Sequence, residues 1–275
     1  MSSYVVVGAS RGIGWGFVEY LSADASNTVV GIVRNSGPTI ERVKSEFPDR
    51  KNITILQADL DDETSLQKAA ADTAKITGGS LDYLIGVAAY LPMYDQLDGP
   101  AYLLSQGHED FAKQFHQYMN TNVLAQIFLY EAYLTLLLKG KAKKVLSLSS
   151  AMGDLDLNRE QEMVHAILYS TSKAALNMVN VKYGVQYKKD GVLFLSICPG
   201  FVLTDTYNNL LPEQKEKAAP IIAKFYAYAP NFAGKTYTPV ESVQKMLSVL
   251  EKCSIENGDS GKYLSHLGTN KRWLP

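Results

Sequence analysis

Short apolar runs alternate with longer amphipathic segments along this chain of 275 residues. Apolar runs of about four to eight residues bounded by glycine or polar residues predict buried parallel strands, and apolar positions three and four residues apart predict helices. The predicted strands are residues 3–10, 27–34, 52–59, 81–89, 143–150, 192–200 and 261–268. The predicted helices are residues 12–23, 39–47, 61–79, 111–140, 169–189 and 238–252.

This alternation of strands and helices indicates the fold class. Right-handed crossovers between parallel strands cover both faces of a sheet with helices. We therefore predict an α/β protein with one Rossmann-type, doubly wound parallel sheet of seven strands, and a single domain over residues 1–275. Residues 91–107 and 153–162 are predicted as loops, and 201–237 as a lid-like segment rich in proline and aromatic residues, with room for short helices.

Composition excludes several kinds of partner. The formal net charge is -1 and no run is rich in lysine and arginine, so no nucleic-acid partner is expected. No apolar run approaches the roughly 20 residues of a membrane span, and the first strand leaves no room for a signal peptide, so we expect a cytoplasmic protein without a membrane partner. The four histidines have no metal-ligand spacing, and Cys198 and Cys253 are expected to be buried free thiols.

The motif YSTSK, residues 169–173, carries the candidate chemistry. On a helix, Tyr169 and Lys173 lie four residues apart and point the same way. An ammonium beside a phenol favours the phenolate, which predicts a lowered pKa for Tyr169. A phenol of this kind can act as a general acid that protonates a carbonyl oxygen. Such a pair is common by chance, and a surface pair without function is the alternative interpretation when the motif stands alone.

A glycine-rich turn, GASRGIG, follows the first predicted strand and opens the first predicted helix. Glycines there let the backbone approach a pyrophosphate, and the helix N-terminus supplies N–H donors. The expected cofactor contacts in this turn are Gly8, Ser10, Arg11, Gly12, Ile13 and Gly14. A plain tight turn is the alternative.

The end of the second strand indicates which dinucleotide is bound. Where a carboxylate usually binds the ribose hydroxyls of NAD, this chain has Arg34 and then Asn35. Arg11 and Arg34 suit the extra phosphate of NADPH, because guanidinium makes paired bonds to phosphate oxygens. The alternative is that both are solvated surface arginines. Asp59 is predicted to meet the adenine amino group, with helix capping beside Asp61 as a compatible alternative.

In combination these segments resemble the short-chain dehydrogenase/reductase family over nearly the whole chain. The motifs that carry the resemblance are GASRGIG, ADL at Asp59 and Leu60, Asn122 in TNVLAQIF, Ser150 in LSLSSAMG, YSTSK, and ICPGFVLTD. Within the family the chain is similar to fungal ketoreductases of the norsolorinic acid ketoreductase type, on VVVGASRGIGWGFVEYL, VVGIVRN, the paired alanines after strand four, Trp273 and Pro275.

The resemblance implies hydride transfer between NADPH and a carbonyl carbon. It implies that Tyr169 donates the proton, that Ser150 donates a hydrogen bond to the developing alkoxide, and that Lys173 also holds the nicotinamide ribose. Asn122 would anchor a water between Lys173 and solvent. Nicotinamide-side contacts are expected at Ala88, Ala89, Pro199, Gly200, Val202 and Thr204. The family's Asn-Asn-Ala-Gly reads Gly86-Val87-Ala88-Ala89 here, which puts local rigidity in doubt.

Apolar and aromatic residues near the predicted strand ends favour a bulky hydrophobic or aromatic ketone or aldehyde as substrate. The candidates are Tyr90, Met93, Tyr94, Met152, Leu155, Phe201, Tyr207, Phe225, Tyr226 and Tyr228. His165 lies near the catalytic helix and could touch substrate, but the favoured placement is at the surface. The long apolar helix beside the Tyr169 helix favours a homodimer or homotetramer.

Two other functions remain open at this level. One is a related enzyme on the same scaffold that reduces imines or enones, or catalyses a non-redox step. The other is a non-catalytic NADP(H)-binding regulator, which has no need of Ser150, Tyr169 and Lys173 together.

Overall fold

A parallel sheet of seven strands, in the order β3-β2-β1-β4-β5-β6-β7, forms the centre of the protein. The computed structural model describes residues 1–204, 210–229 and 236–270. The strands are β1 Ser3–Val7, β2 Thr28–Val33, β3 Ile53–Gln57, β4 Tyr83–Gly86, β5 Lys144–Leu148, β6 Leu193–Cys198 and β7 Tyr263–Ser265. The strand order reverses between β1 and β4, which is where ligands bind in open α/β sheets. The predicted fold class is confirmed.

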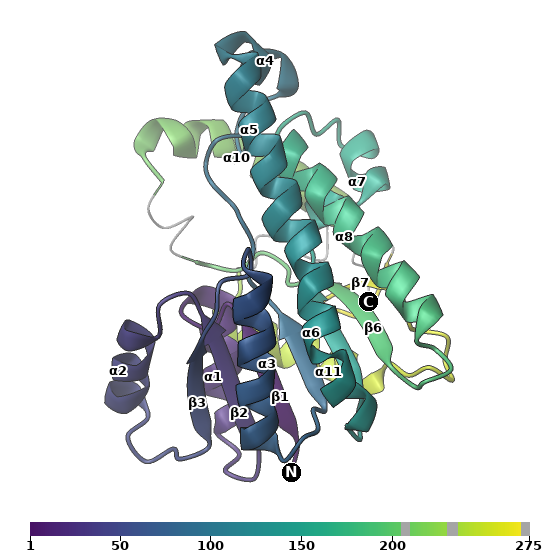
Figure 1. Ribbon diagram of the computed structural model, residues 1–275. Helices are drawn as coiled ribbons and strands as arrows, with labels where there is room; N and C mark the ends of the chain where they lie inside the picture. Colours follow the sequence, from purple (N-terminus) through teal and green to yellow (C-terminus); the bar gives the residue numbers. More distant parts are fainter. Residues whose placement is uncertain (205–209, 230–235, 271–275) are drawn as a thin grey trace.

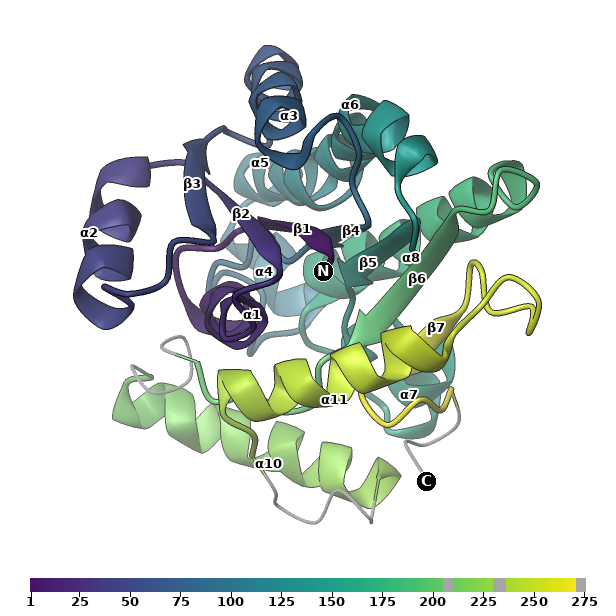
Figure 2. The same cartoon turned by 90° about the horizontal axis from the view of Figure 1, so that it is seen from below.

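Helices cover both faces of this sheet (Figures 1 and 2). The helices are α1 Gly12–Ser22, α2 Ser36–Glu46, α3 Glu63–Thr77, α4 Pro100–Gln106, α5 His108–Met119, α6 Ala125–Lys139, α7 Leu155–Glu160, α8 Ile167–Gln186, α10 Pro212–Tyr228 and α11 Pro239–Lys252. One buried cluster packs α3 and α6 against one face of the sheet, and a second packs α1 and α11 against the other. The strands read as almost wholly apolar runs because each is covered on both sides.

Local signals fix several helix ends. A capping box opens α11, with Thr238 accepting from the Glu241 N–H and Glu241 accepting from the Thr238 N–H. At α3 the cap is Asp62, which accepts from the Thr64 and Ser65 N–H groups. Asp61 is therefore not the capping residue.

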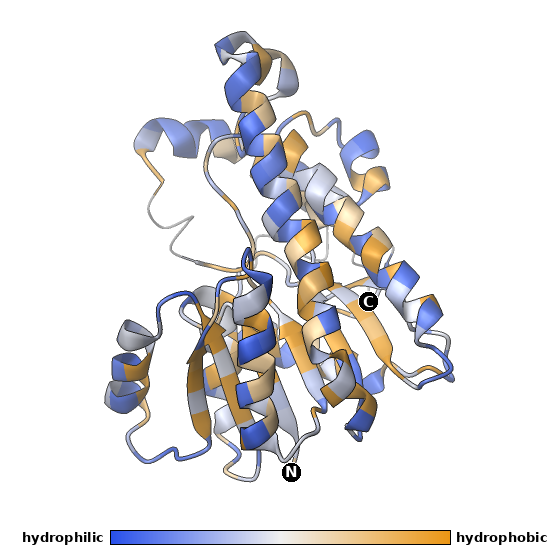
Figure 3. Ribbon diagram, viewed as in Figure 1, coloured by the Kyte–Doolittle hydropathy of each residue, from blue (hydrophilic) through white to orange (hydrophobic). Residues whose placement is uncertain are grey.

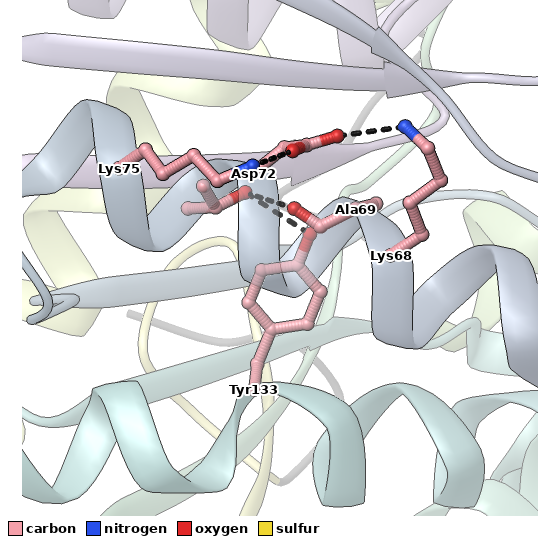
Figure 4. A network of polar contacts seen from close by, with 6 residues as sticks. Lys68, Ala69, Asp72, Lys75 and Tyr133 are labelled. Carbon is pink, nitrogen blue, oxygen red and sulfur yellow. Dashed lines mark hydrogen bonds and ion pairs between the residues drawn. The ribbon is translucent and has the colours of Figure 1, made fainter.

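Contacts between α3 and α6 combine apolar packing with a buried hydroxyl pair. Tyr133 Oη lies 3.3 Å from Thr73 Oγ1, which itself donates to the Ala69 carbonyl. On the solvent side of α3, Asp72 pairs with Lys68 and Lys75 (Figure 4). Exposed pairs of this kind contribute little, so the buried contacts hold this layer.

Three segments differ from the sequence-based prediction. The segment 91–107 contains α4, and the segment 153–162 contains α7. The segment 201–237 contains α10, a helix of 17 residues with Pro220 inside it. Short or proline-containing helices with few buried residues give too weak a periodic pattern for prediction.

The predicted helix 111–140 begins earlier, at His108, and a π-helical turn at Asn120–Leu124 separates α5 from α6. The run His108–Lys139 is long and apolar enough, by length and composition alone, to cross a membrane. Half of its most apolar window is buried in the fold. The prediction that no apolar run approaches the length of a membrane span was therefore wrong by length and composition, although the helix itself was predicted.

Helices α4, α7, α10 and the first part of α5 lie beyond the carboxyl ends of the strands (Figure 1). The second half of α5, α6 and α8 run side by side across the sheet (Figures 1 and 2). Of the predicted catalytic residues, Tyr169 and Lys173 lie on α8, and Asn122 lies in the turn between α5 and α6.

Candidate active site

Lys173 and Tyr169 lie on one face of α8, as their spacing predicts. Lys173 Nζ is 5.7 Å from the centre of the Tyr169 ring and donates to the Leu148 carbonyl at 2.8 Å. The side chain of Lys173 is buried, and burial lowers its pKa to about 8, against a small opposing effect of Cys198. The site therefore holds a buried amine, with a pKa below its ordinary value, beside the ring of a phenol.

Ser150 is brought to this pair by a tight turn. It follows β5 and its Oγ accepts from the Met152 N–H, which opens a 3₁₀ turn at Ala151–Gly153. A Cβ on Gly153 would lie 3.0 Å from the Lys173 carbonyl carbon, so any larger residue would push the turn and α8 slightly apart. The predicted Ser150–Tyr169–Lys173 set is thus assembled from two adjoining elements.

Asn122 lies inside the π-helical turn and is buried. In that turn the Ala125 N–H bonds the Asn120 carbonyl, five residues back. The Asn122 side chain accepts from the Tyr90 N–H at 2.6 Å and donates to the Tyr90 carbonyl and to Ser172 Oγ. Its amide therefore fixes the segment after β4, and its predicted role in holding a water stays a prediction.

The glycine-rich turn has the close approaches that glycine alone allows. A Cβ on Gly8 (φ +89°) would lie 2.7 Å from the Ala88 nitrogen, and one on Gly14 would lie 2.0 Å from the Gly8 carbonyl oxygen. Gly12 (φ +54°) is more open, with Thr204 Cγ2 as its only neighbour within 4 Å among the described residues. The backbone is therefore accessible at Gly12, whereas at Gly8 and Gly14 it is packed closely against other backbone.

The start of α1 is suited to a dinucleotide pyrophosphate. Its N-cap residue, Arg11, makes no side-chain cap, and its first turn carries no acidic residue. By contrast, α3, α7 and α11 are capped by Asp62, Asp154 and Thr238. Uncapped N–H groups behind open glycine backbone are the donor set that a pyrophosphate uses. The residues present therefore fit a nicotinamide dinucleotide.

The predicted adenosine-side residues Ser10, Arg11, Arg34, Asn35 and Asp59 are exposed. The Asp59 carboxylate accepts from the Asp61 N–H at 3.1 Å, a local turn that leaves its other oxygen available. Leu60 is buried beside it.

Sequence reasoning missed a third arginine at this end of the molecule. Arg42 on α2 donates to the Ser10 carbonyl at 3.3 Å and stacks on Trp15, with its guanidinium 4.0 Å from the ring centre. A hollow of about 350 Å³ is lined by Arg11, Gly12, Arg42, Thr204 and others. An arginine nine residues beyond the end of β2 has no fixed motif position that could have revealed it.

Residues 199–204 cross from the end of β6 towards the glycine-rich turn. Ser242 donates to the Pro199 carbonyl at 2.8 Å, and Val202 forms a β-bridge with Tyr237. Gly200 (φ +81°) packs on the ring of His266, where a Cβ would lie 2.7 Å from that ring. Thr204 then reaches Gly12. Of the predicted nicotinamide-side residues, Thr204 and Ala88 therefore lie against the predicted pyrophosphate turn, at Gly12 and Gly8.

An apolar cluster surrounds Tyr169 on the side of α7 and α10. Its buried members include Met152, Met163 and Tyr228, and Phe201, Phe225 and Tyr226 pack against it with Tyr169. Five of the ten predicted substrate residues thus belong to this cluster or pack against it: Met152, Phe201, Phe225, Tyr226 and Tyr228.

One prediction about this region was wrong. His165 is only 7% exposed, not at the surface, and burial lowers its pKa. Leu155, the first residue of α7, is 79% exposed, and its place at the substrate pocket stays a prediction. Tyr207, Trp273 and Pro275 lie outside the described residues.

The sequence also gave no signal for Asp95, a fully buried carboxylate between β4 and α4. It accepts from the N–H groups of Leu168 and Tyr169 and from Tyr118 Oη. Burial and this carboxylate raise the pKa of Tyr118 well above its ordinary range. Within residues 1–204, 210–229 and 236–270, no group of three or more histidine, cysteine or acidic residues could hold a metal ion.

Comparison with known proteins agrees with this architecture. The family model of short chain dehydrogenases matches residues 3–215. The short chain dehydrogenase virK of Hypocrea virens is 44% identical over the whole of both chains, and the short-chain dehydrogenase/reductase iacC of Pestalotiopsis fici is 43% identical, also over the whole of both.

Solved structures show the same fold. The NADPH-bound carbonyl reductase from chicken fatty liver is 26% identical, with a TM-score of 0.77 and 99% of each chain covered. The carbonyl reductase Sniffer of D. melanogaster shares the fold at 21% identity and a TM-score of 0.76, with 99% of this chain and 100% of that chain covered.

The chain belongs to the short-chain dehydrogenase/reductase family. It is an oxidoreductase of that family, whose members use NAD(P)H.

Proposed function

We propose that the protein is an NADPH-dependent carbonyl reductase that converts a bulky hydrophobic or aromatic ketone or aldehyde into an alcohol, reversibly. The observation that carries this proposal is the buried Lys173 amine beneath the Tyr169 ring, with the Ser150 turn packed against the same turn of α8. Burying an amine at this position destabilises the fold. Residues with strongly shifted pKa values cluster at functional sites, so this burial supports a role for Lys173 in proton transfer.

Each of the three residues has a distinct task in the proposed reaction. NADPH, when bound, supplies the hydride. Tyr169 donates a proton to the carbonyl oxygen as that oxygen gains negative charge, and Ser150 donates a hydrogen bond to the same oxygen. Protonated Lys173 favours the phenolate that Tyr169 becomes after donation. The rim of apolar and aromatic residues excludes water from this transfer.

Exposed arginines support NADPH over NADH. The end of β2 carries Arg34 instead of a carboxylate, and Arg11 lies in the turn that faces it. An exposed guanidinium can reach a 2′-phosphate and make two charge-assisted bonds to it. The NADPH complex of the chicken carbonyl reductase gives independent support, since that protein is similar in fold and sequence.

The substrate class rests on the cluster around Tyr169. Met152, Met163, Phe201, Phe225 and Tyr226 present polarizable and aromatic groups beside the phenol. A pocket of this composition favours a large apolar ketone over a sugar or a small acid. Among family members we infer a fungal ketoreductase of the norsolorinic acid ketoreductase type, which the full-length relatives from fungi support.

We further infer that the protein forms a homodimer or homotetramer in the cytoplasm. Met178, Val181 and Val185 are exposed along one side of α8, at positions three and seven residues apart. This set of residues is called the α8 stripe below. Figure 3 shows hydrophobic turns along α6 and α8 on the same side of the molecule. A second copy of this chain would cover the stripe.

The test is a fluorescence titration with NADPH and NADH, followed by a panel of ketones, aldehydes, imines and enones monitored by NADPH consumption. We expect tighter binding of NADPH and turnover of bulky aromatic ketones. Turnover of imines or enones alone would contradict carbonyl reduction. Tight NADPH binding without any turnover would contradict catalysis and favour a regulator.

A further inference from the structure

Asp95 is a fully buried carboxylate whose oxygens are both engaged. Its Oδ2 accepts from the Leu168 N–H at 2.8 Å and from the Tyr169 N–H at 3.0 Å. Its Oδ1 accepts from Tyr118 Oη at 2.6 Å and from Gln96 Nε2 at 2.9 Å. A buried charge is tolerated only with such a complete set of donors, and the N-terminus of a helix adds positive potential.

The residue at the N-cap position of α8 cannot cap the helix with its side chain. That residue is Ala166, which has no side-chain oxygen and adopts a left-handed conformation (φ +57°, ψ 37°). The Ala166 N–H donates to the Asp95 carbonyl at 2.7 Å. Asp95 therefore caps the second and third residues of α8 from a position more than 70 residues away in the sequence. A local Asp or Thr does this at α3 and α11.

We infer that Asp95 is a positioning residue for Tyr169, an inference that rests on the proposed function of Tyr169 as proton donor. The capped N–H group belongs to Tyr169 itself, so the carboxylate fixes the backbone from which the phenol projects. Reacting groups must be held within fractions of an ångström for efficient transfer. Loss of the cap would let the first turn of α8 fray, which displaces the phenol from the substrate oxygen.

The other side of the Tyr169 backbone is held from the same segment. Ser172 Oγ donates to the Tyr169 carbonyl at 2.8 Å and accepts from Asn122 Nδ2 at 3.0 Å. Asn122 in turn bonds both the N–H and the carbonyl of Tyr90. Residues 90–95 thus hold the Tyr169 N–H directly through Asp95 and its carbonyl through Asn122 and Ser172. These bonds tie the segment after β4 to α8, directly beyond Gly86-Val87-Ala88-Ala89, where the family motif has Asn-Asn-Ala-Gly.

The experiment compares Asp95→Ala and Asp95→Asn with a matched control, Asp62→Ala, which removes the same kind of cap from α3. At saturating NADPH, Asp95→Ala should lower kcat at least tenfold while KM for the ketone and the Kd for NADPH stay within about twofold. Asp95→Asn keeps an oxygen that can accept from both N–H groups, so it should restore kcat to within about threefold. Asp62→Ala should lower Tm without lowering kcat.

Several outcomes would overturn the inference. One is an unchanged kcat in folded Asp95→Ala, and another is an equal loss of kcat in Asp62→Ala. Asp95→Asn conserves the buried shape, so it tests the role even if Asp95→Ala does not fold. A folded Asp95→Asn that has lost more than 100-fold in kcat would show that the charge, not the cap, is required. An inactive wild-type protein would contradict the proposed function, and the positioning role would fall with it.

Discussion

The two ends of the site differ in the burial of their polar side chains. At the cofactor end, Arg11 and Arg34 are exposed, and the binding surface is made of backbone. At the catalytic end, Asp95, Asn122 and Lys173 are at most 3% exposed and each is hydrogen-bonded to backbone groups of another segment. One end can adjust its side chains to an arriving ligand, whereas the other is assembled when the chain folds.

This difference separates affinity from rate. Substituting an exposed cation changes ligand binding and hardly alters the fold, because surface substitutions are usually within about 0.5 kcal/mol in stability. Substituting a buried polar residue changes both the rate and the stability, since each such group was desolvated on folding. Variants at the two ends should therefore have different signatures.

The largest expected effect is that of Tyr169→Phe. This change removes the phenolic proton from the catalytic end, and general acid catalysis contributes about 100- to 10,000-fold in rate. We expect turnover to fall by about that factor, while the Kd for NADPH measured by fluorescence stays within about twofold. Tyr183→Phe on the same helix, which removes a hydroxyl bonded to Glu131 far from the phenol, is the matched control. Near-normal turnover of Tyr169→Phe would contradict the mechanism.

Lys173→Met should separate rate from stability most clearly. Turnover should fall about 100-fold, as when one charge-stabilising donor is removed from an active site. Thermal stability should rise, because methionine fills the same volume without a buried ammonium. The control is Lys182→Met, an exposed lysine on the same helix. A destabilised Lys173→Met protein would show that the bond to Leu148 outweighs the cost of burial.

The difference in unfolding free energy between Lys173→Met and the wild type should depend on pH with a defined sign. The pKa of Lys173 is about 8 in the folded protein against an ordinary value of 10.5, so the folded state disfavours the protonated form. The destabilisation from burying the Lys173 ammonium is complete below pH 8 and is relieved as pH rises from about 8 to 10.5. From the difference between the two pKa values, the stability advantage of Lys173→Met over wild type should shrink by about 3 kcal/mol over that pH range. Denaturant unfolding of wild type and Lys173→Met at pH 7 and pH 10 measures it.

At the cofactor end, Arg34→Asp should change ligand preference with little change in the fold. A charge-assisted bond contributes about 1.5–3 kcal/mol, so the affinity for NADPH should fall about 10- to 100-fold while that for NADH is kept or improved. Titration with both cofactors measures the ratio. Lys44→Asp makes the same charge change on an exposed lysine of α2 and should leave the ratio unaltered. An equal shift in the NADPH/NADH ratio in both variants would contradict a specific bond from Arg34 to the cofactor, because it would show that the net charge of this surface alone sets the preference.

The same contrast explains which parts of the molecule could be predicted from sequence. All seven strands were predicted because runs such as Val5–Val7 and Leu193–Cys198 are apolar on both faces. The Tyr169–Lys173 pair and the glycine-rich turn were predictable because helical spacing and glycine conformation are local properties.

Non-local contacts could not be predicted in this way. Asp95 is an ordinary loop residue in the sequence, and its role appears only when α8 meets it in space. The burial of His165 and the exposure of Leu155 likewise depend on where α7 and α10 lie. Helix α10 itself has only Ala218 and Tyr228 as buried residues among its described positions, too few for a periodic signal.

The smallest effect on turnover is expected from the α8 stripe, which belongs to neither end of the site. Exposed apolar residues at helical spacing favour association, so the double variant Met178→Asp with Val185→Asp should convert an oligomer into monomer. Sedimentation velocity measures the change, and activity per subunit should stay within about threefold. Leu155→Asp, an exposed leucine on α7, is the control and should keep the assembly intact. A wild-type protein that sediments as a monomer, or an unchanged assembly in the double variant, would contradict the proposed interface.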